Sequence, residues 1–185
     1  MGNLQNYQAK ICLTASGCLI VNDRVLLVKH RKLNFWLNPG GHLEPNELPH
    51  LAAQREFEEE TGLKVRTVNY STLAATDDSQ YLPNPISTNL HWVSRQNFAS
   101  RQQAEEQQLP FSPEEKWPAG CEQHLNFIYL VEPVSGLKFS HHPEEVTDIA
   151  WFAKSKIDQL DTIDNIKQEI RLAFRLMSQI KRHGD

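Results

Sequence analysis

Three glutamates crowd one face of a segment that the sequence predicts to be helical. Glu56, Glu59 and Glu60 are three and four positions apart, so their side chains leave neighbouring points of the same helix face. Glu56 and Glu60 are separated by about one turn, roughly 6 Å along the axis. Like charges at this spacing repel, so the fold needs a compensating cation beside them. Hard oxygen ligands favour Mg²⁺ or Mn²⁺, which leave positions for phosphate oxygens and water.

The residues around these glutamates predict where the helix begins and ends. Asn46 is a suitable N-cap residue, Pro49 is tolerated in the first turn, and Gly62 is suited to close the helix. Arg55 can pair with Glu47, two turns back, and would then tie the preceding loop to the helix. In that case Arg55 forms a structural ion pair.

Apolar, β-branched runs elsewhere predict strands. We expect strands over residues 9–21, 25–28, 63–73, 125–131 and 146–152, a hairpin turn at Asn22-Asp23, and an amphipathic helix over 162–181. This order predicts a mixed α/β domain with helices packed on a sheet. Residues 94–120 are rich in Gln, Glu, Ser and Pro, which predicts a surface insertion with a short helix at its centre. The 185 residues fit one domain, so we expect a single domain over 1–185.

The overall charge limits the partners of the chain. The formal net charge is -4 at pH 7 and the isoelectric point is near 6.1. Proteins that bind nucleic acid by neutralising many phosphates are usually basic, so these values argue against nucleic acid as a partner. An acidic protein that handles anionic substrates needs a local positive element, such as a bound cation.

The cysteines and the apolar runs bear on the cellular compartment. Cys12, Cys18 and Cys121 are scattered and odd in number. Their spacing matches neither a disulfide framework nor a zinc site, so we expect all three to be reduced and structural. The first residues show no basic segment followed by an apolar run, so we expect no targeting signal, and no apolar stretch approaches the roughly 20 residues that span a bilayer. We therefore expect a cytoplasmic protein without a membrane segment.

The spacing around the glutamates resembles the Nudix box. Nine constrained positions match it, which makes the signal specific: Gly41, Glu47, Arg55, Glu56, Phe57, Glu59, Glu60, Gly62 and Leu63. Phe57 departs mildly from the pattern, since an aliphatic residue is commoner there. The flanks agree, because the residues from Trp36 to Gly41 resemble the family's entry loop and Ala150 to Phe152 resemble its late strand.

The resemblance implies an α/β fold, a Nudix-type α/β/α sandwich with a mixed β-sheet. Such a protein hydrolyses the diphosphate linkage in a nucleoside diphosphate derivative with Mg²⁺ or Mn²⁺. In the family pattern Glu56, Glu59 and Glu60 bind the cations, and the carbonyl of Gly40 adds a ligand. Catalysis then consists mostly of charge neutralisation and alignment of an attacking water.

The family pattern leaves the general base open. Arg55 and Glu56 belong to the expected catalytic set, and Glu59 of the box is one candidate base. A glutamate on a later loop is the other candidate, where we favour Glu145 over Glu144. The adjacent histidines 141 and 142 are expected in an exposed turn.

Four further residues are candidate substrate contacts. They are His42 and Glu44 after the glycine pair, His124 at the head of a strand, and Trp36 before the loop. A structural role is the alternative for both histidines, and packing in the core is the alternative for Trp36. Residues 81–86 and 124–129 are expected to line the pocket. The substrate is expected to be a small nucleotide-like molecule, with oxidised dNTPs, ADP-ribose, dinucleotides and capped RNA all open.

Two other functions share the fold. A catalytically silent nucleotide-binding Nudix module usually lacks box glutamates, and this chain keeps them all. A prenyl diphosphate isomerase needs a catalytic cysteine in a setting that none of the three cysteines here shows. Homodimers are common in the family, so a homodimer is compatible with this chain.

Overall fold

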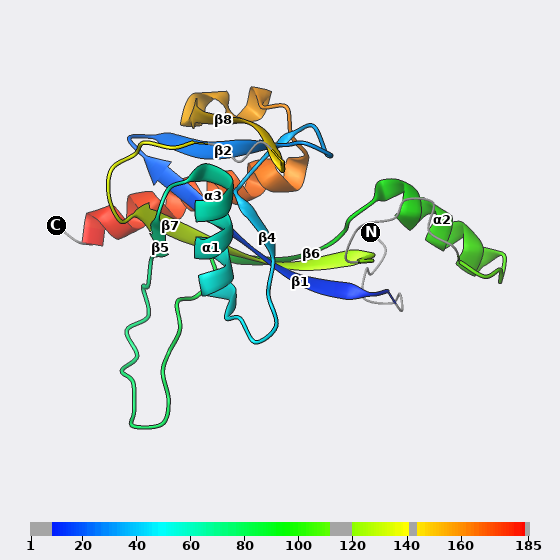
Figure 1. Cartoon of the computed structure of the whole chain (residues 1–185), viewed down its shortest axis with the longest axis horizontal. Coiled ribbons are helices and arrows are strands. Elements are labelled where there is room, and N and C mark those ends of the chain that lie inside the picture. The colour runs from blue at the N-terminus through cyan, green and yellow to red at the C-terminus, as the bar shows by residue number, and fades with distance from the viewer. Residues whose placement is uncertain (1–8, 112–119, 141–143, 184–185) are drawn as a thin grey trace.

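Two long strands run side by side and parallel through the middle of the molecule. They are β1 (Ile11–Val21) and β7 (Gln123–Pro133), paired from Ile11 opposite Gln123 to Leu19 opposite Val131. The computed structural model describes residues 9–111, 120–140 and 144–183 (Figure 1). β1 contains several β-branched residues, and β7 contains β-branched and aromatic residues, which suit a sheet that is packed on its two faces.

Each long strand has two different partners along its outer edge. β4 (Gly40–His42) lies along the first half of β1 and β2 (Arg24–His30) along its end. β6 (Ser87–Trp92) and β5 (Val65–Thr67) share the edge of β7, while β3 (Trp36–Leu37) and β8 (Val146–Ala153) pair with β2. Among the described strands only β1 and β7 pair in parallel, so the eight-stranded sheet is mixed.

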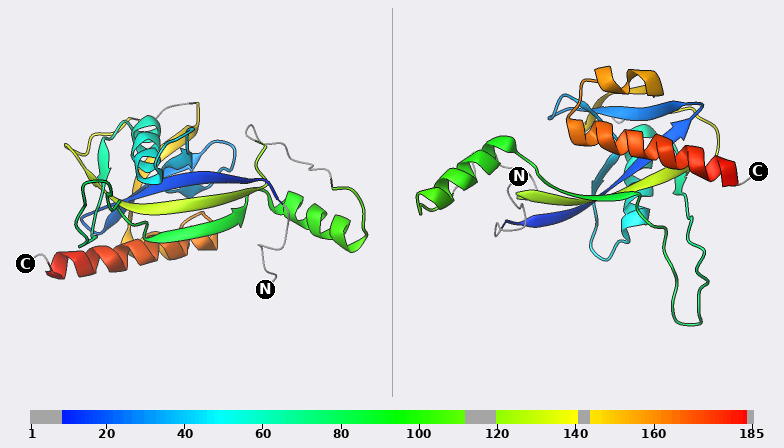
Figure 2. Two further views of the ribbon diagram at one scale, coloured as in Figure 1. Left: turned by 90° about the horizontal axis from the view of Figure 1, so that it is seen from below. Right: turned by 180° about the vertical axis from the view of Figure 1, so that it is seen from behind.

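Helices cover both faces of the sheet. α1 (Pro49–Thr61) and α3 (Asp164–His183) lie on opposite sides of it (Figure 2). Successive side chains of β1 point to opposite faces. Ala15 therefore joins the apolar cluster that contains Phe57 of α1, and Cys18 joins the cluster that contains Phe174 of α3. The predicted α/β/α sandwich with a mixed sheet is confirmed.

Two predicted chain reversals are also confirmed. Asn22 and Asp23 have φ values of 48° and 55° in the turn between β1 and β2. A two-residue hairpin turn of this kind needs positive φ, which Asn and Asp tolerate. Gly62 ends α1 with φ of 69°, and its N–H donates to the carbonyl of Glu58 at 2.7 Å.

The predicted N-cap of α1 was wrong. Asn46 lies in the preceding turn with φ of 66°, and Leu48 is the N-cap. The carbonyl of Leu48 accepts hydrogen bonds from the N–H groups of Leu51 and Ala52, so the helix begins with Pro49 at its first position. Proline there leaves no N–H unpaired, which makes a side-chain cap less necessary.

The strand predicted over residues 63–73 is shorter, and its successor was missed. β5 covers only Val65–Thr67, and the chain then forms a long loop before it returns as β6 (Figure 1). β6 occupies the same edge of β7 that a longer β5 would need, with Ser87 opposite Ile128. The competition for one edge is a tertiary effect, so the local sequence did not reveal it.

The insertion at residues 94–120 begins with a helix instead of carrying one at its centre. α2 spans Arg95–Glu106, and the Ser94 hydroxyl accepts a hydrogen bond from the N–H of Asn97 at 3.0 Å as its N-cap. Residues 112–119 lie outside the described part. A 3₁₀ helix, η2 (Lys154–Gln159), joins β8 to α3. No helix in the described ranges is both long and apolar enough to cross a membrane.

The prediction that all cysteines are reduced was wrong for two of them. Cys12 and Cys121 form a disulfide that closes a separation of 109 residues, and Cys18 alone is free and buried among the described cysteines. The parallel pairing of β1 with β7 brings the two sulfurs together, because Cys12 lies opposite His124 and Cys121 precedes β7. The spacing of the two cysteines in the sequence does not indicate this contact.

We expect the disulfide to stabilise the fold by about 2–4 kcal/mol, the typical value for a bond that closes a long loop. A thermal melt of the metal-free protein should therefore shift to lower temperature when a reductant is added. The Cys12→Ser, Cys121→Ser double variant is the control, and its melting temperature should not respond to the reductant. An equal response of both proteins would contradict the prediction.

Candidate active site

The three clustered glutamates of α1 differ in burial. Glu60 and Glu56 are 2% and 9% exposed, whereas the Glu59 side chain is 56% exposed. Ala53 and Phe57 of the same helix are fully buried in the core beside β1. The tight packing of these residues draws the adjoining glutamates against the sheet. Two of the three carboxylates are therefore held in a region of low solvent access.

Arg55 connects the glutamates to the loop before the helix. Its Nε and Nη2 donate to the two carboxylate oxygens of Glu47, each at 2.9 Å, as predicted. Its Nη1 donates to Glu56 at 2.8 Å and to Glu59 at 2.9 Å. Nη2 also donates to the carbonyl of His42 at 2.9 Å. A planar guanidinium with forked donors can hold several acceptors in fixed relative positions.

These hydrogen bonds shift the pKa values of Glu47 and Arg55. The hydrogen bond from Arg55 is the main cause that lowers the pKa of Glu47. The same bond is the main cause that raises the pKa of Arg55. Both groups stay ionised at neutral pH, so Arg55 is a positioning residue that aligns Glu56 and Glu59 from one side.

The glycine pair of β4 meets the glutamates from the other side. The N–H of Gly40 donates to Glu60 Oε2 at 3.0 Å. A Cβ at Gly41 would lie 2.4 Å from the carboxyl carbon and one oxygen of Glu56, which is far below a normal contact. Only glycine permits this approach of strand backbone and carboxylate. The register that places Gly40 opposite Ser16 of β1 fixes the position of β4.

Burial disfavours the ionised form of these carboxylates when no positive partner lies beside them. It raises the pKa of Glu60 to about 8. The negative charges of Glu56, Glu145 and Glu59 add to this rise, whereas the hydrogen bond from the Gly40 N–H lowers the pKa. Burial is also the main cause that raises the pKa of Glu56. A cation held by these oxygens would remove the repulsion. The donor set consists of hard oxygen atoms, so the residues fit Mg²⁺ or Mn²⁺.

A pH-dependent stability follows from Glu60. Its pKa rises from 4.5 to about 8 on folding, so its stabilising contribution is complete below about pH 4.5 and is lost as the pH rises through about 8. We expect the melting temperature of the metal-free protein to fall over this range. Mg²⁺ should raise the melting temperature more near pH 8 than near pH 5. Equal pH dependence in wild type and Glu60→Gln would contradict the assignment.

Glu145 comes close enough to act on the glutamates of α1. It is exposed in the turn before β8, and its carbonyl accepts a hydrogen bond from the N–H of Arg31 at 2.9 Å. Its negative charge contributes to the raised pKa of both Glu56 and Glu60. Glu144 contributes its carbonyl to the Arg31 side chain. The two histidines that precede them, 141 and 142, lie outside the described residues.

The candidate substrate contacts separate into two groups. His42 and His124 lie together, with ring centroids 4.8 Å apart, and burial lowers the pKa of His124 to about 4, helped by His42 and His91. Trp36 instead packs edge-on against Phe152 at 4.7 Å, beside the core under α3. Glu44 is exposed, and its N–H donates to Glu47 in the turn before α1.

Sequence reasoning missed a cleft between β6 and α3. Its volume is about 370 Å³, and its lining is mostly polar: Ser87, Thr88, Asn89, Leu90, Asn165, Gln168, Glu169, Leu172 and Arg175. Asn89 Nδ2 donates to Glu169 Oε1 at 3.0 Å, although Glu169 is only 7% exposed. The predicted pocket segments 81–86 and 124–129 do not line this cleft. Glu169 and Asn165 are polar residues beside the apolar face of this helix, and that was the only sign of the cleft in the sequence.

A row of polar side chains joins this cleft to β4. Asn126 of β7 lies opposite Asn89. Its amide donates to Ser16 at 3.2 Å and accepts from Thr14 at 3.2 Å. Ser16 in turn lies opposite Gly40. One face of the sheet is therefore polar from the glycine pair to the cleft.

The fold is an α/β/α sandwich with a carboxylate cluster on one helix, and the comparisons identify the family. The chain belongs to the Nudix family, because the family model for the NUDIX domain matches residues 13–174. It is 29% identical over 108 residues to the m7GpppN-mRNA hydrolase NUDT17 of Xenopus laevis, covering 55% of this chain and 36% of that protein. The chain thus spans about a third of the length of this curated relative.

Solved structures show the same fold. A hydrolase of the NUDIX family from Clostridium perfringens has a TM-score of 0.65 and 26% identity, covering 89% of this chain and 97% of that chain. A UDP-X diphosphatase has a TM-score of 0.57 and 18% identity, covering 95% of this chain and 67% of that chain. The second likeness is one of fold alone.

Proposed function

We propose that this chain hydrolyses the diphosphate linkage of a small nucleoside diphosphate derivative. The observation that carries the proposal is the cluster of Glu56, Glu59 and Glu60, held between Arg55 and the glycine pair of β4. A divalent cation bound there would neutralise the diphosphate charge and lower the pKa of the attacking water. The membership of the chain in the Nudix family and the names of its relatives support this reaction class.

The remaining residues have distinct proposed roles. Arg55 holds the carboxylates in register, and the N–H of Gly40 keeps Glu60 turned toward β4. The Gly40 carbonyl is the further oxygen ligand that we propose for the cation. Glu145 is the proposed general base, because its charge acts on Glu56 and Glu60 from the solvent side.

We place the nucleoside part of the substrate along the polar row, on the α3 side of the sheet, with the diphosphate reaching the carboxylates of α1 at Gly40, which contacts Glu60. Asn126, Asn89 and Glu169 offer hydrogen-bond donors and acceptors that lead from Gly40 toward the cleft beside α3. The volume of the cleft lies within the range of small-molecule sites, and its mostly polar lining suits a polar nucleoside. His42 and His124 border the opposite end of the same sheet face and are proposed to contact the leaving part of the substrate.

A substrate panel tests the proposal. The panel contains ADP-ribose, a UDP-sugar, a dinucleoside polyphosphate, an oxidised dNTP and a capped oligonucleotide, each with Mg²⁺ and with Mn²⁺. We expect release of a nucleoside monophosphate from at least one member, and none when a chelator is present. Nucleotide binding by calorimetry without any turnover would instead identify a catalytically silent binding module.

The role of Glu145 has its own test. We expect Glu145→Gln to lower kcat by about 10²-fold, the lower range for loss of a general base. The acidic limb of the pH–rate profile should be lost as well. Glu144→Gln is the matched control, because it is the neighbouring exposed glutamate. Equal losses of kcat in both variants would contradict the role of Glu145 as the general base.

A further inference from the structure

A second group of metal-ligating side chains lies beside the glycine pair. It consists of Cys12, His42 and Cys121, whose ligand atoms all lie within 4.8 Å of one another. His42 Nε2 is 3.3 Å from Cys121 Sγ. The three residues come from β1, from β4 and from the segment just before β7, so sheet pairing alone assembles them. None of the three is among the carboxylate ligands of α1.

The geometry of this group suits a tetrahedral ion. Zinc with bonds of about 2.3 Å to sulfur and about 2.0 Å to nitrogen holds its ligand atoms roughly 3.5–3.8 Å apart. The distance from His42 to Cys121 is already near this value. The Cα atoms of Cys12 and Cys121 are 5.7 Å apart, so both thiolates can reach one ion by side-chain rotation. His42 is exposed, which gives an ion access from solvent.

His124 lies beside this group but outside it, and would supply a fourth ligand of the right kind after a side-chain rotation. It lies opposite Cys12 in the parallel pairing of β1 with β7, and its ring is 4.8 Å from that of His42. The buried His91 stands behind it at 5.6 Å, and the Nδ1 of His91 has no hydrogen-bond partner among the described residues. Two cysteines with two histidines form one of the common zinc-binding sets.

We propose that Cys12, Cys121, His42 and His124 form a binding site for a soft divalent cation of the zinc type once the disulfide is reduced. Reduction by a phosphine breaks the S–S bond with two electrons from phosphorus. The phosphine becomes a phosphine oxide with oxygen from water, and the two protons of that water go to the cysteine sulfurs. The cation then binds both thiolates and displaces those two protons. Hydrogen peroxide would reverse the step: it takes two electrons from the thiolates and two protons from solvent, becomes two molecules of water, and leaves the disulfide, which releases the cation.

This site is chemically distinct from the carboxylate site. Thiolate and imidazole select zinc-like ions, whereas carboxylates select Mg²⁺ or Mn²⁺. The two sites share β4, because the carbonyl of His42 accepts a hydrogen bond from Arg55. The inference shares His42 and His124 with the proposed substrate contacts, but its test needs no turnover, so each proposal can fail without the other.

Cobalt binding tests the proposal directly. The whole chain is reduced with a phosphine under nitrogen and titrated with Co²⁺ in excess Mg²⁺, which occupies the carboxylates. We expect one equivalent of Co²⁺ to produce the thiolate-to-cobalt absorption, Zn²⁺ to abolish it, and the oxidised protein to show none. Absence of this absorption in the reduced protein would overturn the proposal.

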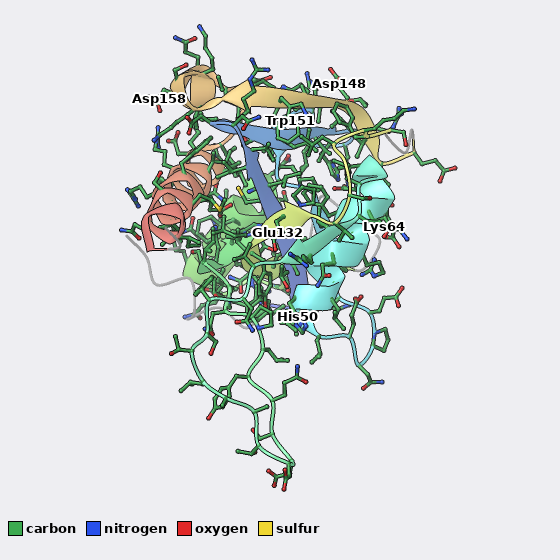
Figure 3. All side chains as sticks on the ribbon, turned by 90° about the vertical axis from the view of Figure 1, so that its left-hand side faces the viewer. His50, Lys64, Glu132, Asp148, Trp151 and Asp158 are labelled. Atoms are coloured by element: carbon green, nitrogen blue, oxygen red, sulfur yellow. A yellow bond between two sulfur atoms is a disulfide. The ribbon has the colours of Figure 1, made fainter. Side chains whose placement is uncertain are left out.

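Variants assign the ligands. Cys12→Ser and Cys121→Ser should each lose the absorption, and His42→Ala and His124→Ala should each weaken Co²⁺ binding at least tenfold. His50→Ala is the matched control, because His50 lies in the first turn of α1 (Figure 3) and is not in the group of Cys12, His42 and Cys121, so binding should be unchanged. The site would be contradicted if Cys12→Ser kept the absorption, or if His42→Ala and His124→Ala both bound Co²⁺ with unchanged affinity.

A measurement on the unaltered protein covers the case of a variant that does not fold. Zn²⁺ should slow the alkylation of reduced Cys12 and Cys121 at least tenfold, as read by mass spectrometry of the peptides. The buried Cys18 serves as the internal reference, because its exposure does not depend on the ion. Alkylation of Cys12 and Cys121 at the same rate with and without Zn²⁺ would overturn the proposal.

Discussion

Glu60→Gln is expected to lower the metal-dependent kcat/KM by about 10³-fold. The carboxylate of Glu60 is almost completely buried and is oriented by the N–H of Gly40. The amide keeps the shape but loses the charge that attracts a divalent cation. Loss of several kcal/mol of charge stabilisation in the transition state corresponds to this factor. The measurement is steady-state hydrolysis of whichever panel member the wild type cleaves, with Mg²⁺ varied.

Glu58→Gln is the control for this substitution. Glu58 lies on the same helix but is exposed, and it pairs at 3.5 Å with Lys64 beyond the end of α1. A surface pair of this kind contributes little to stability, so the variant should behave as wild type. Similar losses of activity in Glu58→Gln and Glu60→Gln would show that helix charge in general, and not the buried carboxylate, supports the activity.

Gly41→Ala is expected to lower kcat by about 10²–10³-fold and stability by about 1–3 kcal/mol. The new methyl group would lie within 2.6 Å of all three carboxyl atoms of Glu56. Either β4 or Glu56 has to move, and a shift of about 1 Å in a catalytic group can cost 10²-fold. Overpacking adds the loss of stability. Melting curves and kinetics on the same samples separate the two effects.

Gly136→Ala is the comparison for this change. A Cβ at Gly136 meets no atom within 4 Å, although the φ of 54° makes the substitution mildly strained. We expect it to lose about 1 kcal/mol of stability and no activity. If Gly41→Ala retained wild-type kcat, the close approach of β4 to Glu56 would have no part in catalysis.

Helix-based features were predicted well because their information is local. The spacing of Glu56, Glu59 and Glu60 decides which side chains share a face, whatever surrounds the helix. The pairing of Arg55 with Glu47 and the end of α1 at Gly62 follow from the same short segment. The N-cap was misplaced because Asn46 was judged by residue type alone, while the turn before Pro49 decided where the helix begins.

Features that depend on strand pairing were predicted poorly. The length of β5 depends on β6, which competes for the edge of β7. The cleft depends on α3 packing against β6, and the lining residues of the two elements are 75 or more positions apart in the chain. No local pattern reports such contacts. The burial that raises the pKa of Glu60 likewise comes from packing and not from the order of residues.

The sequence by itself determined the family, because the spacing of the three glutamates, Arg55 and the glycine pair lies within one short segment. The tertiary structure alone decided what surrounds those carboxylates. It brought Glu145 toward Glu56 and Glu60, and it placed Cys12, Cys121 and His42 in one cluster across 109 residues of chain. The physical reason is strand pairing, which converts distant positions into neighbours. β1 with β7 joins the two cysteines, β4 with β1 adds His42, and β8 with β2 places Glu145.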